Sequence, residues 1–343
     1  MLQREVRSMK QNKVYACYNL NKNVRLDSSS GAVFSAMAHY VFEKHGVVYG
    51  VAMSEDCYSA EFIKVSDENG VKRLRGSKYL QAKVGNTFNK IKEDLKSGKT
   101  VLFTGTECQV NGLKNFLGKD YDNLICVDVI CHGVPSPALW KKYVEYQEAN
   151  NTSKLTSINF RCKDDSWNDF GMKEVMQNIN QGIEKKIYIS KDKDPFMQMF
   201  LRDYCLRPSC YNCLAKKEKR SDLTIGDFWG INDVAPKMND RIGTSLVIIR
   251  TDKGHIIFNN INYAMKVKEV SYESGVKYNP AEYKSCNMPL QRVNFFEDMH
   301  KMDFETLKLK YASPIKYTLR TKVKRKLKST VKNVFKLIEK DKD

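Results

Sequence analysis

Three cysteines with a spacing typical of metal ligands lie in the second half of the chain. Cys205, Cys210 and Cys213 follow the pattern C-x4-C-x2-C within nine residues. Because the C-x2-C turn places both of its sulfurs on one side of a tight loop, the three thiolates can converge on one soft metal centre. The spacing therefore predicts metal ligation, and an iron–sulfur cluster would make the chain a redox protein.

Two further cysteines lie in unusual contexts, and either is a candidate fourth ligand. Cys108 belongs to the sequence Gly-Thr-Glu-Cys-Gln at 105–109, and Cys131 opens Cys-His-Gly-Val-Pro at 131–135. The alternative metal is zinc, which is held by four ligands in closed tetrahedral sites and often by two C-x2-C pairs. Because only one such pair is present, the spacing favours a cluster over zinc.

The composition fits a redox protein of a reducing compartment. The chain of 343 residues is long enough for two domains, and its hydrophobic content of 42% is sufficient for a core. No run of about eighteen apolar residues predicts a membrane span, and the polar N-terminus does not lead into the apolar segment of a secretory signal. We therefore expect a cytoplasmic protein whose ten cysteines are thiols or metal ligands rather than disulfides.

Regularly alternating strands and helices in the first half of the chain predict an α/β sheet with ligand loops at the strand ends. The region that follows, 151–289, is strand-rich and less regular, as in an α+β domain. No glycine-rich dinucleotide motif or P-loop supports a nucleotide site of those types. The expected strands are 46–52, 61–65, 99–105 and 124–130, and the expected helices are 32–44, 83–95, 108–117 and 137–148.

Two of these strands end in sequences that suit a ligand. The strand 99–105 runs into Thr104-Gly105-Thr106 at a helix start, which leaves backbone N–H groups and hydroxyls for an anion or a ring carbonyl. A simple N-capped helix is the alternative.

The strand 124–130 runs into a loop fixed by glycine and prolines, with Cys131 and His132 at its rim. His132 is a candidate proton donor or a loop hydrogen-bonding residue, and adjacent side chains that point apart argue against a Cys–His nucleophile pair.

The net charge of +18 is concentrated at the C-terminal end. Residues 314–343 hold eleven Lys or Arg against three acids, a net charge of +8, which leaves +10 over the other 313 residues. Apolar residues recur three and four apart in this tail between basic ones, which predicts a basic amphipathic helix on an anionic lipid surface. The alternative is a helix packed on the protein's own body. Because few aromatic residues lie between its basic residues, the tail does not indicate nucleic-acid binding.

Taken together, five ordered motifs resemble one family, the beta subunits of coenzyme F420 (8-hydroxy-5-deazaflavin) hydrogenases and dehydrogenases. The resemblance covers roughly residues 25 to 290 and is to the bacterial members found beside genes for surface polysaccharide synthesis. The motifs are Ser-Ser-Ser-Gly-Ala-Val-Phe-Ser at 28–35, Gly-Ser-Lys-Tyr-Leu-Gln at 76–81, Gly-Thr-Glu-Cys-Gln at 105–109, Cys-His-Gly-Val-Pro-Ser-Pro at 131–137 and Ser-Asp-Leu-Thr-Ile-Gly-Asp-Phe-Trp-Gly at 221–230.

The resemblance implies an oxidoreductase with FAD and a [4Fe–4S] cluster that passes electrons between the cluster and a hydride-accepting partner. Carried over to this sequence, it implies that Cys205, Cys210 and Cys213 are cluster ligands, with Cys108 or Cys131 completing the set. Lys78 is placed near the flavin or its phosphates, with a surface ion pair as the alternative. The flavin-contacting positions that the resemblance implies are Ser29, Ser30, Gly31, Lys78, Thr104, Gly105, Thr106 and Gln109.

Two departures from the family pattern affect these expectations. Many members begin with a ferredoxin-like C-x2-C-x2-C segment, whereas this sequence has only Cys17 there, so we expect electrons to come from a separate carrier, ferredoxin or another. The usual proline of the Gly-Thr-Pro-Cys-Gln motif is Glu107, which is expected to place an acid beside the cofactor and to disfavour a reduced, anionic flavin. Neither the substrate nor the use of coenzyme F420 follows from the resemblance.

The sequence therefore predicts an α/β N-terminal domain, an α+β domain with the cysteines, and a basic amphipathic C-terminal helix. The expected segments are 1–46, 47–125, 126–290 and 291–343. The expected function is that of an iron–sulfur flavoprotein, with peripheral membrane contact through 314–343 as a further hypothesis and without nucleic acid as a partner. The rival is a non-enzymatic scaffold with a structural zinc, recruited to the membrane in a polysaccharide-assembly complex.

Overall fold

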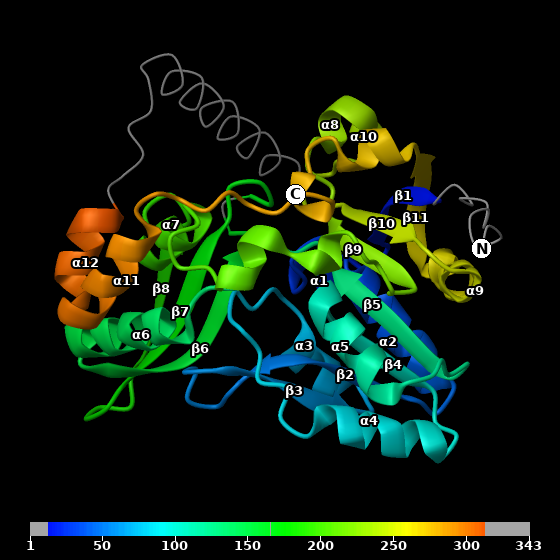
Figure 1. Ribbon diagram of the computed structural model, residues 1–343, viewed down its shortest axis with the longest axis horizontal. Helices are drawn as coiled ribbons and strands as arrows, with labels where there is room; N and C mark the ends of the chain where they lie inside the picture. Colours follow the sequence, from blue (N-terminus) through cyan, green and yellow to red (C-terminus); the bar gives the residue numbers. More distant parts are fainter. Residues whose placement is uncertain (1–12, 165, 313–343) are drawn as a thin grey trace, which may run out of the picture.

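A computed structural model describes residues 13–164 and 166–312, and a mixed eight-stranded sheet forms its larger part (Figure 1). Its three central pairings, β2 with β4, β4 with β5 and β5 with β9, are parallel, and the outer pairings are antiparallel. The strands, in spatial order, are β11 (Met265–Val270), β1 (Val14–Asn19), β10 (Ser245–Ile249), β9 (Leu223–Asp227), β5 (Leu124–Val129), β4 (Val101–Thr106), β2 (Val47–Met53) and β3 (Ala60–Val65).

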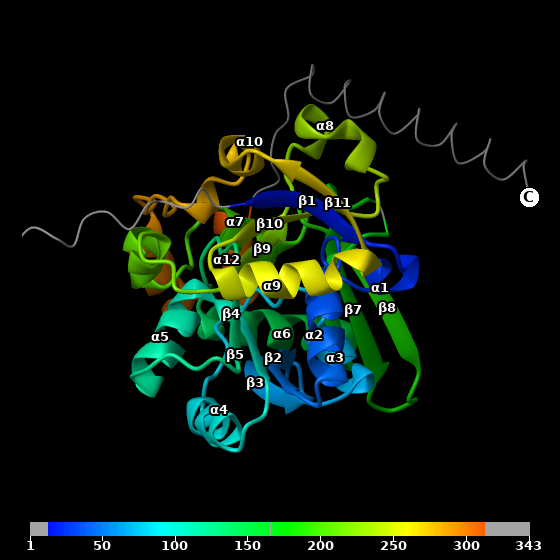
Figure 2. The ribbon, with the colours of Figure 1, turned by 90° about the vertical axis from the view of Figure 1, so that its right-hand side faces the viewer.

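Helices cover both faces of this sheet because its central strands are apolar on both sides. In β4, Val101 and Phe103 pack into one core cluster and Leu102 into another, as side chains that alternate between faces must. Figure 2 shows α2 and α9 on the Leu102 face. The helices with side chains in these clusters are α2 (Val33–Glu43) and α9 (Asp252–Ile261) on the Leu102 face, and α4 (Thr87–Lys96) and α5 (Glu107–Leu117) on the Phe103 face.

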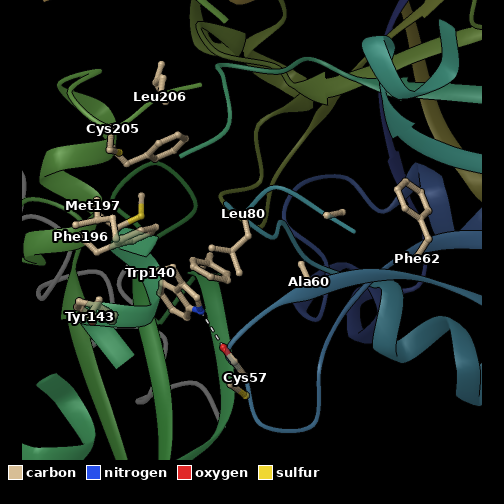
Figure 3. Close-up of a cluster of buried hydrophobic side chains, with 14 of the residues drawn as sticks. Cys57, Ala60, Phe62, Leu80, Trp140, Tyr143, Phe196, Met197, Cys205 and Leu206 are labelled. Atoms are coloured by element: carbon tan, nitrogen blue, oxygen red, sulfur yellow. Dashed lines mark hydrogen bonds between the residues drawn. The ribbon is translucent and has the colours of Figure 1, made fainter. Parts of the chain in front are cut away.

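A smaller antiparallel sheet and four helices form a second lobe, gathered on the left of Figure 1. Its core joins that of the large sheet. The indole N–H of Trp140 donates to the carbonyl oxygen of Cys57, 2.8 Å away, across the boundary (Figure 3). The elements of this lobe are β6 (Ser153–Cys162), β7 (Gly171–Asn178), β8 (Glu184–Ser190), α6 (Pro137–Asn151), α7 (Pro195–Leu201), α11 (Arg292–Lys301) and α12 (Phe304–Tyr311).

Short elements connect these layers. The α-helical ones are α1 (Lys22–Leu26), α3 (Glu68–Leu74), α8 (Ile231–Val234) and α10 (Tyr272–Val276), and the 3-10 turns are η1 (Pro208–Asn212), η2 (Leu214–Lys216), η3 (Pro236–Met238), η4 (Asn262–Ala264) and η5 (Pro280–Glu282).

The α/β fold followed by an α+β part, expected from the sequence, is confirmed, and so are the eight strands and helices expected before residue 151. The large sheet draws strands from three of the four expected segments, because β1, β9, β10 and β11 join β2 to β5. The basic helix expected at 314–343 lies outside the described residues. Among the helices that the structure does describe, none has the length and apolar character needed to cross a bilayer.

A buried group of acids lies in the core of the second lobe. The hydroxyl of Tyr143 is 2.5 Å from Glu174 Oε1 and 2.7 Å from Asp194 Oδ2, and both carboxyl groups are buried. A phenol has one proton to donate, so the second short contact requires a proton on a carboxyl group. Burial raises the pKa of Asp194 to about 7 and also raises the pKa of Glu174. The folded chain therefore holds a proton that the unfolded chain releases.

We expect the substitution Glu174→Gln to change how stability depends on pH. Because the folded-state pKa values are raised, the stabilisation from this group is complete below the ordinary carboxyl range and is lost as the pH rises towards 7. The glutamine keeps the shape of the Glu174 side chain but removes one of the two buried carboxyl groups. Between pH 4 and 7 the free energy of unfolding of the variant should therefore rise by on the order of 1–2 kcal/mol relative to the wild type. Chemical unfolding across this range measures the difference. The exposed Glu145→Gln on the same lobe is the control, and parallel curves for Glu174→Gln and wild type would contradict the prediction.

Candidate functional site

A cavity of about 300 Å³ lies at the carboxyl ends of the parallel strands. Its walls come from the ends of β4 (Thr104–Thr106), of β5 with the following loop (Val129–Val134) and of β9 (Ile225–Asp227). This edge is where ligands bind in open α/β sheets, because the loops that follow parallel strands converge there. The volume is at the lower end of the range for small-molecule sites, and it suits one planar ring system.

Seven of the eight flavin-contacting positions expected from the sequence line this cavity, and they come from three separate segments of the chain. Gly31 is the exception, because it packs behind the wall. A Cβ atom there would lie 2.5 Å from the carbonyl oxygen of Cys17 and 2.8 Å from the backbone nitrogen of Ser245. The lining positions are Ser29, Ser30, Lys78, Thr104, Gly105, Thr106 and Gln109. Their contact with a flavin stays a prediction.

The serine loop is held in place by its own side chains and by a buried lysine. Ser29 Oγ accepts from the backbone nitrogen of Ser77 at 2.8 Å, and Ser30 Oγ donates to the carbonyl oxygen of Thr244 at 2.8 Å. Lys163 Nζ donates to the carbonyl oxygens of Arg25 and Ser30, among others. Rigid hydroxyls and backbone groups therefore face the cavity before any ligand enters.

Lys78 is neither exposed nor part of an ion pair in the described structure. Its ammonium lies 2.7–3.3 Å from the carbonyl oxygens of Arg73, Leu74, Arg75 and Gly76, around the end of α3, and donates its three hydrogens among them. Burial lowers its pKa to about 7. In its protonated form, the lysine satisfies the unpaired carbonyls of a helix C-terminus and brings a positive charge to the cavity wall.

The turn from β4 into α5 is a capping box. Gln109 Oε1 accepts from the backbone nitrogen of Thr106 at 2.9 Å, and Thr106 Oγ1 lies 3.1 Å from Cys108 Sγ. Glu107 does not line the cavity, and its place beside a cofactor stays a prediction. The Glu107 side chain is buried on the other side of the turn, where its carboxylate accepts from the backbone nitrogen of Arg220. Burial, followed by the nearby charge of Asp128, raises the pKa of Glu107 to about 7.

Four of the candidate metal ligands influence one another electrostatically, and one of them, Cys131, lines the cavity. Burial comes first among the causes that raise the pKa values of the Cys131 and Cys210 thiols, to about 12 for Cys131. The nearby Cys108 thiol raises both pKa values further. The Cys210 thiol also raises the pKa of Cys131, and the Cys213 thiol raises the pKa of Cys210. Cys108 is exposed and the other three residues are half-buried, with Cys210 packed against the edge of the core. Their mutual electrostatic effect places them in one group, which we call the cysteine group.

Cys205 has different surroundings from the cysteine group. It is fully buried in the apolar core beside Phe196 and Leu206 (Figure 3), and the charged groups that act on its thiol are Asp203 and Arg292. Its role as a ligand stays a prediction of the spacing.

The thiols of the cysteine group are not gathered around a single point. In the described part of the chain, no three His, Cys, Asp or Glu side chains are arranged to hold one metal ion. A cubane cluster does not require such an arrangement, because its four thiolates bind four different iron atoms. The donor set is four thiols, one exposed and three half-buried, and thiolates are the ligands that hold such a cluster.

The loop after β5 joins the cysteine group to the cavity. Cys131, His132, Gly133 and Val134 all line the cavity. Gly133 has a φ of +154°, and a Cβ atom there would lie 2.8 Å from Leu206 Cδ1 and 3.4 Å from Cys210 Cβ. Only glycine allows this loop to lie so close to the segment that carries Cys210.

Two residues that the sequence analysis did not single out complete this corner of the site. His132 Nε2 lies 2.6 Å from Asp203 Oδ1, and Asp203 adopts a φ of +64°, which few residues other than glycine adopt. Cys286 Sγ lies 3.6 Å from the carbonyl oxygen of His132, and Cys210 acts on its pKa. His132 is therefore a bonded loop residue with one ring nitrogen committed to Asp203. Neither new residue belongs to a short motif, so no local signal pointed to them.

The Gly-Asp-Phe-Trp-Gly motif, residues 226–230, supports the part of the cavity wall that follows from β9. Asp227 lines the cavity and pairs with Arg161 at 2.7 Å, and Arg161 is 3% exposed. Trp229 stacks on Trp167 with ring centroids 5.4 Å apart. Gly230 has a φ of +77° and packs against the ring of Tyr278, where a Cβ atom would overlap the ring. Asp227 therefore has a pairing role at the cavity wall, and Trp229 and Gly230 have packing roles behind it.

Comparisons with known proteins agree on one group. Residues 98–274 match the family described as the C terminus of the beta subunit of coenzyme F420 hydrogenase/dehydrogenase. Among solved structures, the chain is similar to one in the F420-reducing [NiFe] hydrogenase complex from Methanosarcina barkeri, with a TM-score of 0.51 and 15% identity over 79% of this chain and 88% of that chain. This likeness shows a shared fold. No curated protein matches the sequence.

Proposed function

The chain belongs to the coenzyme F420 hydrogenase/dehydrogenase beta subunit family, and from this premise we propose that it is an iron–sulfur flavoprotein oxidoreductase. In this proposal a [4Fe–4S] cluster is bound by the cysteine group and FAD lies in the cavity. Electrons pass between the two and on to a hydride-accepting coenzyme similar to F420 or to another small substrate.

The observation that carries the proposal is the loop after β5. Its residues Cys131 to Val134 line the cavity, while Cys131 belongs to the cysteine group. A cluster and a ring system bound at these two places would share this single loop as their boundary. Such adjacency is what a site needs to convert two-electron hydride chemistry into one-electron steps.

The proposed cluster ligands are Cys108, Cys131, Cys210 and Cys213. They are four adjacent thiols, and Lys216 Nζ donates to the carbonyl oxygen of Cys131 at 2.7 Å. A positive charge beside the group favours the thiolate form and a cluster with negative charge. The buried Cys205 then has a packing role, since its thiol faces the apolar core.

The proposed flavin site uses groups that are already fixed. Apolar side chains such as Val51, Leu80 and Phe200 line the cavity together with the hydroxyls of Thr104 and Thr106. Such a cavity excludes water from a bound ring, while the serine and threonine loops supply hydrogen bonds to its edge. When protonated, Lys78 places positive charge at the wall, which favours the anionic form of a reduced ring. The remainder of FAD would extend beyond the cavity.

The physiological partners in this proposal are an electron carrier, ferredoxin or another, and a small substrate within surface polysaccharide synthesis. Peripheral contact with a membrane through residues 314–343 is proposed from the sequence alone, because this segment lies outside the described residues. That the chain is an oxidoreductase of the F420 beta subunit family does not depend on which carrier, substrate or membrane it contacts.

Anaerobic purification followed by a visible spectrum and by iron, sulfide and zinc analysis tests the proposal. We expect flavin absorbance together with a broad cluster absorbance and about four irons per chain. A colourless protein with one zinc per chain would overturn the redox function and support a structural-zinc scaffold. A protein with flavin but without iron would refute the assignment of the cysteine group.

A further inference from the structure

The cysteine group lies beneath an exposed surface formed by two segments of the chain, 206–220 and 279–293. The two segments are held together by hydrogen bonds. The backbone nitrogen of Cys213 donates to Ser285 Oγ at 3.0 Å, and Arg292 Nη2 donates to the carbonyl oxygen of Leu206 at 3.0 Å. Cys286, in the second segment, contacts the carbonyl oxygen of His132. The surface therefore lies directly over the loop that carries Cys131.

Large apolar side chains of this surface are open to solvent. Leu290 is 95% exposed, more than any other large hydrophobic residue in the described ranges. A single exposed leucine needs no explanation, but exposed apolar side chains recur on the two adjoining segments, and we treat them as one patch of the kind that marks an interaction site. The exposed apolar residues of the surface are Leu214, Tyr283, Met288, Leu290 and Val293.

The same surface is positively charged. Arg207, Lys217 and Lys284 are exposed, and no ion pair within residues 13–164 and 166–312 neutralises them. Glu218 is the exposed acid of the two segments, since Glu282 is buried against Arg250. The patch therefore presents apolar contacts inside a basic rim, and it fits a partner with an acidic rim.

We propose, on the basis of the proposed function, that this surface docks a small acidic electron-carrier protein of the ferredoxin class. The place fits the task, because Cys108 is exposed and Cys210 and Cys213 are only half-buried, so that a cluster bound there would lie close to the docked carrier. The basic segment 314–343 carries a net charge of +8, and repulsion from the rim disfavours it as the occupant. The contact is of the small, transient class, in which charge sets the association rate.

The experiment measures the affinity of the full-length protein for an acidic bacterial ferredoxin at low and high salt. We expect binding that weakens as salt is added. The double variant Lys217→Glu with Lys284→Glu is expected to lower the affinity about tenfold. Leu290→Ser, which leaves the charge unchanged, is expected to raise the dissociation rate with little change in the association rate. Lys90→Glu with Lys96→Glu, two exposed lysines of α4, is the matched control and should change the affinity less than about twofold.

Iron content and the visible spectrum, recorded on the same samples, separate two kinds of failure. A preparation without iron overturns the proposed function and this inference with it. If iron is present but ferredoxin does not bind, or if both charge reversals act equally, the docking surface is refuted while the proposed function stands. Anionic vesicles are the last probe, and loss of vesicle binding in the Lys217/Lys284 variant without loss of ferredoxin binding would assign the surface to a membrane instead.

Discussion

Replacing Cys210 by alanine is expected to remove at least three quarters of the iron from the anaerobically purified protein. A cubane cluster needs four thiolates, and Cys210 is central to the cysteine group because both Cys108 and Cys213 act on its thiol. Removal of one ligand leaves an iron atom without its anchor, so the whole cluster should be lost. The corresponding substitutions at Cys108, Cys131 and Cys213 should have the same effect.

Cys205→Ala separates the two possible ligand sets. If the cysteine group binds the cluster, Cys205→Ala should keep its iron and lose about 1–2 kcal/mol of stability, as expected for a truncated side chain in the core. Cys162→Ala, at another buried cysteine, is the matched control. Loss of iron in Cys205→Ala with full iron in Cys108→Ala would instead support the set 205, 210 and 213 that the spacing predicts.

The sequence predicted the site to the extent that its parts are local. Each loop that follows a parallel strand carries its own motif, and β4 and β5 are neighbours in both sequence and sheet. The loops at Thr104 and Cys131 could therefore be expected to meet. Ser29 and Lys78 joined the same cavity only through the resemblance, because nothing in their own segments points to β4.

The parts that were missed depend on distant pairing. Strand β1 was not expected, although all of its residues are buried, because it is held by β10 and β11, with Val14 opposite Ile248 and Val270. Cys286 and Asp203 lie far from the motifs that they touch and have no spacing pattern. The sequence also did not indicate that Glu107 is held by the backbone nitrogen of Arg220, which is more than a hundred residues away. Such contacts appear only when the chain is folded.

The spacing of Cys205, Cys210 and Cys213 does not indicate how deeply each sulfur is buried. C-x4-C-x2-C says that three sulfurs can come together, but the burial of each sulfur depends on what packs around it. Leu206 lies beneath Gly133 and is fully buried, which carries the neighbouring Cys205 into the core. Cys108, which is not part of this triplet and lies in the first turn of α5, is exposed to solvent. The fold therefore ranks candidate ligands that the spacing leaves equal.

Asp227→Asn is expected to lower the free energy of unfolding by about 3–5 kcal/mol, because it leaves a buried guanidinium without its counter-charge. Arg161 is 3% exposed, lies 3.9 Å above the ring centroid of Phe170, and pairs with Asp227 at 2.7 Å. Tyr79 Oη, at 3.4 Å, is the other hydrogen-bond partner recorded for its side chain. Nε and Nη2 of Arg161 have no partner among the described residues, so the charge has little other compensation.

The double variant Arg161→Leu with Asp227→Asn identifies the cause. Removing the charges of both Arg161 and Asp227 should recover much of the lost stability. Burying an ion pair carries a large desolvation penalty, so a protein often tolerates the loss of both charges. Chemical unfolding of the wild type, both single variants and the double variant gives the coupling energy. Glu145→Ala, which breaks the exposed pair with Lys141 at 3.7 Å, is the control and should cost less than about 1 kcal/mol. A double variant as unstable as Asp227→Asn would mean that Asp227 stabilises the wall of the cavity by packing, with no contribution from the pairing of charges.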